Sequence, residues 1–599
     1  MKLLRPFRAA ACLAVVSLLL MPASALAQAA PAAPKLRAWV EKSNQNTKIV
    51  NEVVARFGPE GAGQLGIGGL DEQIADLKPN IVERTRAATR EVLAELKKRH
   101  AAEADPLVKQ DLQILIQGSE DAIRNADINE KYYVPYNNVT RLVFGGLRSL
   151  LDDQIAPSRR QAAVVRLRKY AGLEPGYEPI AKLAMDRTRE GKKPGLLGPP
   201  KEQVEQDQSR NPFFVDGISK LLEKYKIEGW QEPFAKLKEQ LAEYDKFVRA
   251  EVLPIARTDF RLPPEDYAFS LHQYGVDIPP ADLARRAHTA FDQLQKEMQA
   301  IATSVAKERG FASADYRDVI RELKKKQIIG EAILPHYKER LAEIEKVIQR
   351  ERLVTLPARP ARIRIATEAE SAASPAPNMR PPRLIGNTGE QGEFVLPLNF
   401  PGKEGEIKRY DDFTYEAVSW TLTAHEARPG HELQFAAMVE AGVSQARAVY
   451  AFNSTNVEGW GLYAESILLP YMPKEGQLVS LQARLMRAAR AYLDPELQAG
   501  KVTPEQALAV LKNDVVLSDA MATQEVERYT FRAPGQATSY FYGYTRLQDL
   551  RKEVEGKLGK KFDQQKFHDF ILAQGLLPPD LLRKAVLAEF AGVKVKASR

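Results

Sequence analysis

The chain has 599 residues and a formal net charge of +8, from 86 Lys and Arg against 78 Asp and Glu. This surplus is small for the length, and the basic residues lie in amphipathic helical patterns, so we expect solvated helix faces and no nucleic-acid partner. The only cysteine, Cys12, lies in a segment that we expect to be removed. Disulfides and thiolate metal ligands are therefore excluded from the mature chain.

The first residues have the pattern of a secretory signal. Three basic residues, Lys2, Arg5 and Arg8, precede an apolar run, 9–20, that is too short to span a bilayer. Ala25-Leu26-Ala27 then offers a cleavage site of small residues. We predict a signal peptide over 1–27, a bacterial periplasmic or secreted protein, and no stable membrane insertion after cleavage.

Helical periodicity dominates 28–351, which we predict to be an N-terminal helical region. Apolar residues recur at spacings of three and four over 70–98, 214–247 and 278–305, with Pro and Gly between these stretches. The histidines of this region have no partner at the spacing of metal ligands, so we expect them to have surface or core roles.

The segment 352–411 is rich in proline, which excludes long helices. Residues 362–366 and 393–396 alternate or cluster apolar side chains as short strands do, so we predict a mixed β and loop segment with a small sheet. An edge strand beside a metal cleft could align an extended peptide through main-chain hydrogen bonds. A hairpin that only packs two helical lobes together is the alternative.

The helical pattern returns in 412–599, where His425-Glu426 precedes His431 by a spacing of six between the histidines. Neutral imidazoles are common zinc ligands, and zinc-peptidase helices usually carry H-E-x-x-H. Six residues turn a regular helix through about 600° and leave the two rings about 120° apart. Pro429 and Gly430 lie between them, so we predict that the helix breaks there and returns His431 to the side of His425. Glu426 is then the expected general base.

A following helical stretch contains Glu458 and Glu465. Two histidines and a glutamate from the next helix form a three-ligand catalytic zinc set with one open position. We therefore predict one zinc ion bound by His425, His431 and Glu458. Glu465 lies about two turns further along the helix, so it is either the rival third ligand or a residue that orients a ligand histidine.

Tyrosine and arginine are concentrated in 528–544. A tyrosine hydroxyl can donate to the oxyanion that forms when water attacks a carbonyl, and arginine can hold a substrate carboxylate by two parallel bonds. Tyr540 is our catalytic candidate, and Arg532 and Tyr542 are candidates for substrate binding or for support of the site. Packing in the core is the alternative for these aromatic residues.

These motifs resemble a bacterial zinc-peptidase-like family catalogued as domain of unknown function 885. Its marks here are His425-Glu426-x-x-Pro429-Gly430-His431-x-x-Gln434, Glu458-Gly459-Trp460-x-x-Tyr463-x-Glu465, and Pro534-Gly535-Gln536-Ala537 with Tyr540 and Gly543. The resemblance covers most of the mature chain. It implies a mostly helical fold, similar in plan to deep-channel helical carboxypeptidases and oligopeptidases, with His425, His431 and Glu458 as ligands and Glu426 as the base.

One segment departs from the family pattern, which has a histidine after Asp and Gly where this chain reads Asp494-Pro495-Glu496-Leu497-Gln498. Gln498 can donate a hydrogen bond but cannot carry charge. If this position contacts substrate or oxyanion, substrate preference or rate should differ from the rest of the family.

Taken together, the patterns predict a mainly α fold, with two helical lobes around a metal cleft and a small β-sheet. The predicted function is that of an exported zinc metallopeptidase that hydrolyses short peptides. The alternatives are a peptide-binding or assembly protein with a structural metal or none, and a hydrolase of non-peptide amides.

Overall fold

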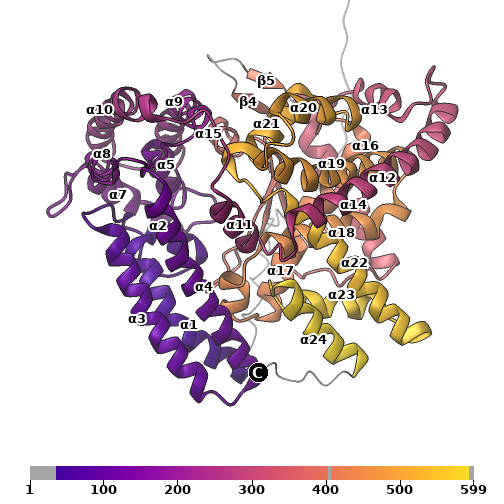
Figure 1. Cartoon of the computed structure of the whole chain (residues 1–599), viewed down its shortest axis with the longest axis horizontal. Coiled ribbons are helices and arrows are strands. Elements are labelled where there is room, and N and C mark those ends of the chain that lie inside the picture. Colours follow the sequence, from indigo (N-terminus) through magenta and orange to yellow (C-terminus); the bar gives the residue numbers. More distant parts are fainter. Residues whose placement is uncertain (1–35, 402–406, 410, 593–599) are drawn as a thin grey trace, which may run out of the picture.

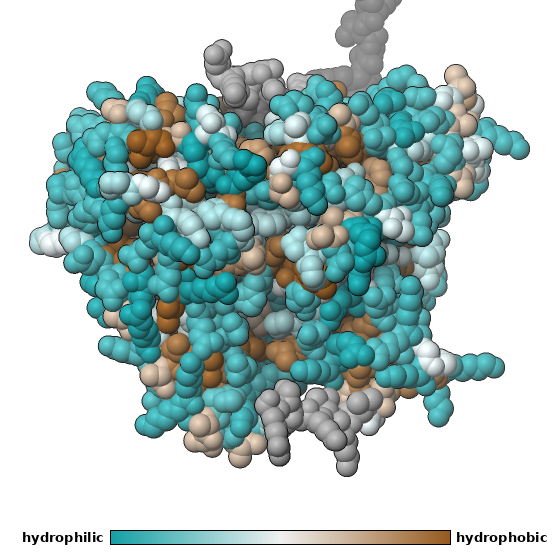
Figure 2. Space-filling model, in the orientation of Figure 1, coloured by the Kyte–Doolittle hydropathy of each residue, from teal (hydrophilic) through white to brown (hydrophobic). Residues whose placement is uncertain are grey.

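The computed structural model describes residues 36–401, 407–409 and 411–592, and the signal segment predicted at 1–27 lies outside them. The described chain is mainly helical and carries a small sheet, which confirms the predicted fold class at this level. Within these residues, no helix has the length and apolarity that a bilayer crossing needs. Figure 2 shows a mostly hydrophilic face with apolar residues in separate patches.

The first ten helices lie together on one side of the molecule (Figure 1). In chain order they are α1 (Ala38–Phe57), α2 (Pro59–Leu65), α3 (Ile81–Ala102), α4 (Pro106–Tyr132), α5 (Val139–Arg148), α6 (Pro157–Arg160), α7 (Ala162–Tyr170), α8 (Ile180–Gly191), α9 (Lys201–Lys224) and α10 (Gln231–Phe247). Helices α5 and α7 to α10 share a core in which Phe144 packs against Phe214 with ring centroids 5.4 Å apart.

Two of the stretches with helical spacing are interrupted. In 70–98 the helix begins only at Ile81, because Pro79 and the left-handed backbone of Asn80 (φ 56°) precede it. In 214–247 the chain turns between α9 and α10, where Lys226 and Gly229 have positive φ. Apolar spacing continued across both turns because loop residues there also pack on the core, so spacing alone overestimated the helices.

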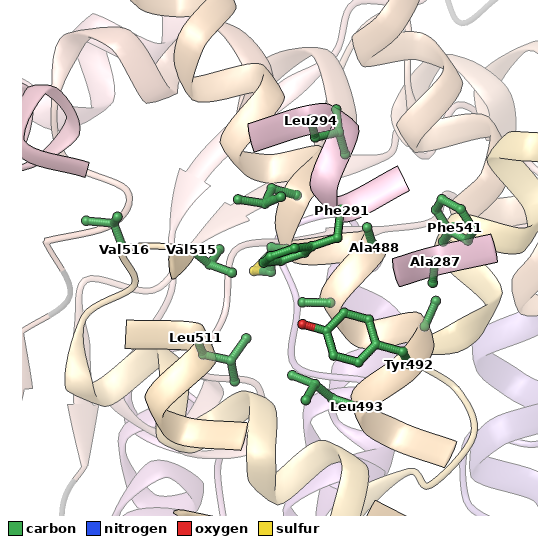
Figure 3. Packing of buried hydrophobic residues seen from close by; sticks show 14 of the residues in the cluster. Ala287, Phe291, Leu294, Ala488, Tyr492, Leu493, Leu511, Val515, Val516 and Phe541 are labelled. Carbon is green, nitrogen blue, oxygen red and sulfur yellow. The ribbon is translucent and has the colours of Figure 1, made fainter. Parts of the chain in front are cut away.

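From α12 onward the helices occupy the other side of the molecule, apart from α15 (Glu368–Ala373), which packs on α9, and α11 lies between the two groups (Figure 1). They are α11 (Pro264–Gln273), α12 (Pro280–Arg309), α13 (Tyr316–Lys324), α14 (Ile333–Arg350), α16 (Glu416–Glu426), α17 (His431–Ala441), α18 (Ser454–Leu468), α19 (Lys474–Gln498), α20 (Pro504–Ala509), α21 (Asp519–Glu527), α22 (Thr538–Leu558), α23 (Gln564–Ala573) and α24 (Pro579–Ala591). Helices α12 and α19 make the most extensive helix–helix contact of the described chain. Between them, the rings of Phe291 and Tyr492 pack edge to face with centroids 5.7 Å apart (Figure 3).

The proline-rich segment carries the small sheet. Its strands are β1 (Arg362–Ile365), β2 (Asn378–Arg380) and β3 (Glu393–Leu396) in the order β1-β3-β2, and a separate pair is formed by β4 (Asn399–Pro401) and β5 (Ile407–Arg409). Strand β1 runs parallel to β3, with Arg362 opposite Glu393, and the short helix α15 (Glu368–Ala373) follows β1. Strand β2 is antiparallel to β3. Both strands expected from the sequence are therefore present, and β3 is the central one.

Two glycines set the distance between α18 and α22. A Cβ on Gly543 would lie 2.0 Å from the carbonyl oxygen of Thr455, and one on Gly459 would lie 2.7 Å from the Cα of Gly543. All of these are backbone atoms that no side-chain rotation can move. The two helices can therefore touch only because both positions lack a side chain.

We predict that Gly543→Ala destabilises the protein by about 1–3 kcal/mol, because the added methyl forces α18 and α22 apart. The matched control is Gly556→Ala, further along α22, where a Cβ would meet no atom within 4 Å. That control should gain roughly 0.5–1 kcal/mol of helix propensity. Unfolding monitored by circular dichroism measures both changes. Equal effects of the two substitutions would show that the close crossing is not needed.

Candidate functional site

The two histidines of the central motif lie on different helices. Helix α16 ends at Glu426 and α17 begins at His431, so the predicted break at Pro429 and Gly430 is confirmed. The peptide bond before Pro429 is cis. A Cβ on Gly430 would lie 2.0 Å from the carbonyl oxygen of His425, so only glycine fits this turn.

The break brings His425 and His431 together with Glu458 of α18. One ligand atom from each side chain lies within 4.8 Å of the others. Oε2 of Glu458 is 3.4 Å from Nε2 of His425 and 3.3 Å from Nε2 of His431, and the two rings are at 80° to each other. These distances exceed a normal hydrogen bond of about 2.9 Å and match the roughly 3.3–3.4 Å edge of a tetrahedron with zinc–ligand bonds of about 2.0–2.1 Å.

Burial and space also fit a metal ion. Oε2 of Glu458 is buried and has no hydrogen-bond partner among the described residues. A Cβ on Gly461, one turn along α18, would lie 2.7 Å from Cε1 of His425 and 2.9 Å from Cε1 of His431. The missing side chain at Gly461 thus makes the room in which both rings reach Glu458.

Glu465 lies behind the cluster. Its Oε1 is 2.8 Å from Nδ1 of His425, the ring nitrogen that faces away from Glu458, and its Oε2 accepts from the Thr421 hydroxyl at 2.6 Å. This is how a carboxylate orients a ligand histidine. Of the two glutamates, Glu458 therefore has the position of a ligand and Glu465 that of its support. His431 is held less firmly, because its buried Nδ1 has no partner in the described part of the chain.

The cluster is strongly polarised. Burial opposes a charge on His425, but the carboxylates of Glu458, 3.4 Å away, and of Glu465, hydrogen-bonded to the ring, outweigh burial and raise the pKa of His425 to about 9. Burial alone would raise the pKa of Glu458, yet the two histidines hold it well below its usual range. The pKa of Glu465 is also lowered, against its burial, by Arg487 and His425. The carboxylates therefore stabilise a positive charge at the position where a cation would be bound.

Glu426 opens onto a cavity beside the cluster. The cavity opens to solvent and spans about 790 Å³, part of it open solvent, and among its lining residues are His425, Glu426, Tyr540 and, from the proline-rich segment, Ala376 and Pro377. Burial raises the pKa of Glu426, and no hydrogen bond to its carboxylate is found among the described residues. A carboxylate with a raised pKa and free oxygens at a cavity is suited to accept and return a proton.

Tyr540 also lines this cavity. Its ring lies nearly parallel to that of His425, 6.3 Å between centroids, and its hydroxyl oxygen accepts from Arg528 at 3.2 Å. Because that bond uses a lone pair, the hydroxyl proton remains available to donate. Burial raises the pKa of Tyr540, so the hydroxyl stays protonated.

The structure does not bring three of the predicted residues to this cavity. Gln498 donates to the carbonyl of Tyr529 at 2.8 Å and accepts from the amide of Leu262 at 2.9 Å, so its amide group joins two backbone segments. Arg532 is paired with Glu527 at 2.5 Å. The hydroxyl of Tyr542 donates to Asp277 and accepts from Arg546, and it lies on the face of α22 opposite to Tyr540. None of the three is among the residues that line the cavity.

Three arginines that the sequence did not single out line the cavity instead. They are Arg487, Arg490 and Arg528, whose guanidinium groups lie 4.4–5.9 Å from the centroid of the Tyr540 ring. Arg490 is bound in two places to buried Glu525, at 2.6 Å each. Arg487 and Arg490 are three apart on α19, which places them on one helix face. That spacing was the one available signal.

A family model described as "Bacterial protein of unknown function (DUF885)" matches residues 59–586, so the chain belongs to this family. Two solved structures share its fold. A protein from Colwellia psychrerythraea, provisionally described as a lipoprotein, has a TM-score of 0.74 and 18% identity over 93% of this chain and 100% of that chain. A protein of unknown function from Shewanella oneidensis, described in the same way, has a TM-score of 0.69 and 19% identity over 92% and 100%. No curated protein matches the chain.

We predict that Glu525→Gln destabilises the protein by about 3–5 kcal/mol, because it leaves the buried guanidinium of Arg490 without its charge partner. The control is Glu553→Gln, which removes the partner of half-exposed Arg583 and should cost less than about 1 kcal/mol. Thermal unfolding of both variants measures the difference. A cost for Glu525→Gln no larger than that of the control would show that the buried pair does not support the arginine wall, which is the set of Arg487, Arg490 and Arg528.

Proposed function

We propose that this member of the family is a zinc-dependent peptidase that hydrolyses short peptides in the cavity lined by Glu426 and Tyr540. The observation that carries the proposal is the set of three ligand atoms, in which Nε2 of His425 and Nε2 of His431 lie 3.4 and 3.3 Å from Oε2 of Glu458, itself buried and unbonded among the described residues. Two imidazoles and one carboxylate are also the donor set of many catalytic zinc sites. His425, His431 and Glu458 would hold the ion.

The other residues divide the chemistry. When bound, zinc supplies a Lewis acid that polarises a carbonyl and makes water easier to deprotonate near neutral pH. Glu426 takes a proton from the attacking water and passes it to the leaving amine. The hydroxyl of Tyr540 donates to the carbonyl oxygen as negative charge develops there. Glu465 positions His425 by holding its Nδ1.

Access and location support short substrates outside the cytoplasm. The cavity is bounded by helices of the second half and by Ala376 and Pro377, so an extended peptide fits it better than a folded chain. Pro377 directly precedes strand β2, which is an edge strand of the sheet. We further propose export, since the N-terminal sequence has the pattern of a signal peptide and both solved relatives are provisionally described as lipoproteins.

The first test is Glu426→Gln. The purified parent should contain close to one equivalent of zinc and hydrolyse short peptides. The variant should keep its zinc but lose about 10²- to 10⁴-fold in rate, because it lacks the base. His425→Ala should lose both zinc and activity.

Each alternative gives a different result in the same assay. A peptide-binding protein would bind peptides equally well before and after Glu426→Gln and hydrolyse none. A hydrolase of other amides would show the loss only on non-peptide substrates. Less than about half an equivalent of a divalent metal in the parent would contradict the metal site itself.

Gly461→Ala tests whether the space between the two rings is part of the site. The methyl would push against both imidazoles while α18 stays helical, so zinc affinity should fall about 10- to 100-fold. Gly118→Ala in α4, where a Cβ would meet nothing within 4 Å, is the matched control. Competition with a zinc chelator measures the affinity. Parent-like affinity in Gly461→Ala would show that the rings can rearrange without losing the ion.

A further inference from the structure

We propose that the arginine wall of the cavity binds the C-terminal carboxylate of the substrate, so that the protein removes single residues from the C-terminus of peptides. This inference rests on the proposed peptidase function and names its substrate class. The wall consists of Arg487, Arg490 and Arg528, which surround Tyr540.

The three guanidinium groups are not equally neutralised. Arg490 is paired through two bonds with Glu525, which also accepts from the hydroxyl of Tyr529 at 2.8 Å. Arg528 lies 4.0 Å from Glu525, beyond hydrogen-bond distance, and it donates to neutral acceptors on Gln536 and Tyr540. One buried carboxylate thus faces two arginines, and only Arg490 is bonded to it.

Arg487 has a similar surplus of donors. Its Nη2 lies 3.6 Å from Glu465, which is already bonded to His425 and Thr421, and its Nη1 donates to the carbonyl of Ala483. Its buried Nε has no partner among the described residues. Of the remaining acids that line the cavity, Asp412 is bonded to Lys324 at 2.6 Å, and Glu426 has no hydrogen bond to these arginines among the described residues.

The three arginine side chains differ in how much of them is exposed to solvent. Arg490 is 4% exposed and is held on both sides, which suits a residue that fixes Glu525 and Tyr540 in place. Arg487 is 11% and Arg528 19% exposed, and both line the cavity. We therefore assign carboxylate binding to Arg487 and Arg528 and a positioning role to Arg490. A planar guanidinium can bind a carboxylate by two parallel, charge-assisted bonds.

The distance from the reaction centre fixes the length of the leaving group. Arg528 is bonded to the same Tyr540 hydroxyl that we expect at the scissile carbonyl, 3.2 Å away. One residue of extended chain spans roughly 3.3–3.6 Å. When Arg528 and Tyr540 bond side by side to one substrate, a carboxylate at Arg528 lies about one residue beyond the carbonyl at Tyr540. Hydrolysis would add water across that bond, leaving a new carboxylate on the shortened peptide and a protonated amine on one released amino acid.

The test uses the zinc-loaded protein and two N-acetylated peptides of one sequence, one with a free C-terminal carboxylate and the other with a C-terminal amide. Mass spectrometry identifies the bond that is cleaved. The free peptide should lose single residues from its C-terminus, and kcat/KM for the amide should be about 10- to 100-fold lower, because a hydrogen-bonded charge is missing.

Arg528→Met should raise KM for the free peptide and abolish the preference over the amide. Because Arg528 also touches Tyr540, the ratio of the two kcat/KM values is the readout, and not the rate alone. Arg484→Met on the same helix as Arg487 is the control: this arginine stacks on Tyr544 and is not among the cavity-lining residues, so the ratio should stay at the parent value.

Equal cleavage of the two peptides, cleavage at internal bonds, or an unchanged ratio in Arg528→Met would overturn the inference and leave the proposed function standing. Failure to cleave either peptide, and also the same peptides without the N-terminal acetyl group, would contradict the proposed function as well. The two failures are therefore separable.

Discussion

The arrangement depends on how closely helix α18 can approach its neighbours. Two histidines on separate helices meet Glu458 only if α18 passes within contact distance of both rings. Side chains are missing where this requires it: at Gly430 in the turn between α16 and α17, at Gly461 under the rings, and at Gly459 opposite Gly543. A Cβ added at any of these glycines would lie within 3.0 Å of another atom. The site is thus limited by backbone packing before any charge is considered.

Charge is the second constraint, and it divides the cavity into two regions. Around the two histidines, Glu426 and Glu465 are buried and the side chain of Glu458 is 17% exposed, and a cation would offset the mutual repulsion of the three carboxylates. Across Tyr540, arginines outnumber the acids that are bonded to them. A peptide bond placed between these regions would have its carbonyl oxygen near a hydroxyl donor and a cation, and its C-terminal side near guanidinium groups. The polarity of the cavity therefore gives a bound peptide one preferred direction.

Local patterns made the helix break, the strands at 362–365 and 393–396, and the placement of His425, His431 and Glu458 predictable. Each depends on residues close in sequence, such as Pro429 and Gly430. Tyr540 and Tyr542 could also have been separated, because two residues turn a helix by about 200° and only one can face the cavity. The arginine wall could not have been predicted from local patterns, because it brings α19 together with the π-helical turn Arg528–Arg532 through Glu525. Likewise Gln498 has a structural role only because two distant backbone segments meet it.

The large N-terminal half supports the site through a few buried polar bonds. Asp111 of α4 accepts from Ser43 of α1 and from Ser444 and Arg447, which follow α17. This joins the end of the second histidine helix to the helices of the other side.

At the start of α18, the amide and hydroxyl of Thr455 both donate to the carbonyl of Tyr274, at 2.9 and 2.8 Å. Thr455 is one turn before Glu458 and is the residue whose carbonyl Gly543 approaches. A shift of α11 would therefore displace the start of α18. Since Glu458 must keep its distance to two rings within tenths of an ångström, α11 helps to fix the position of Glu458.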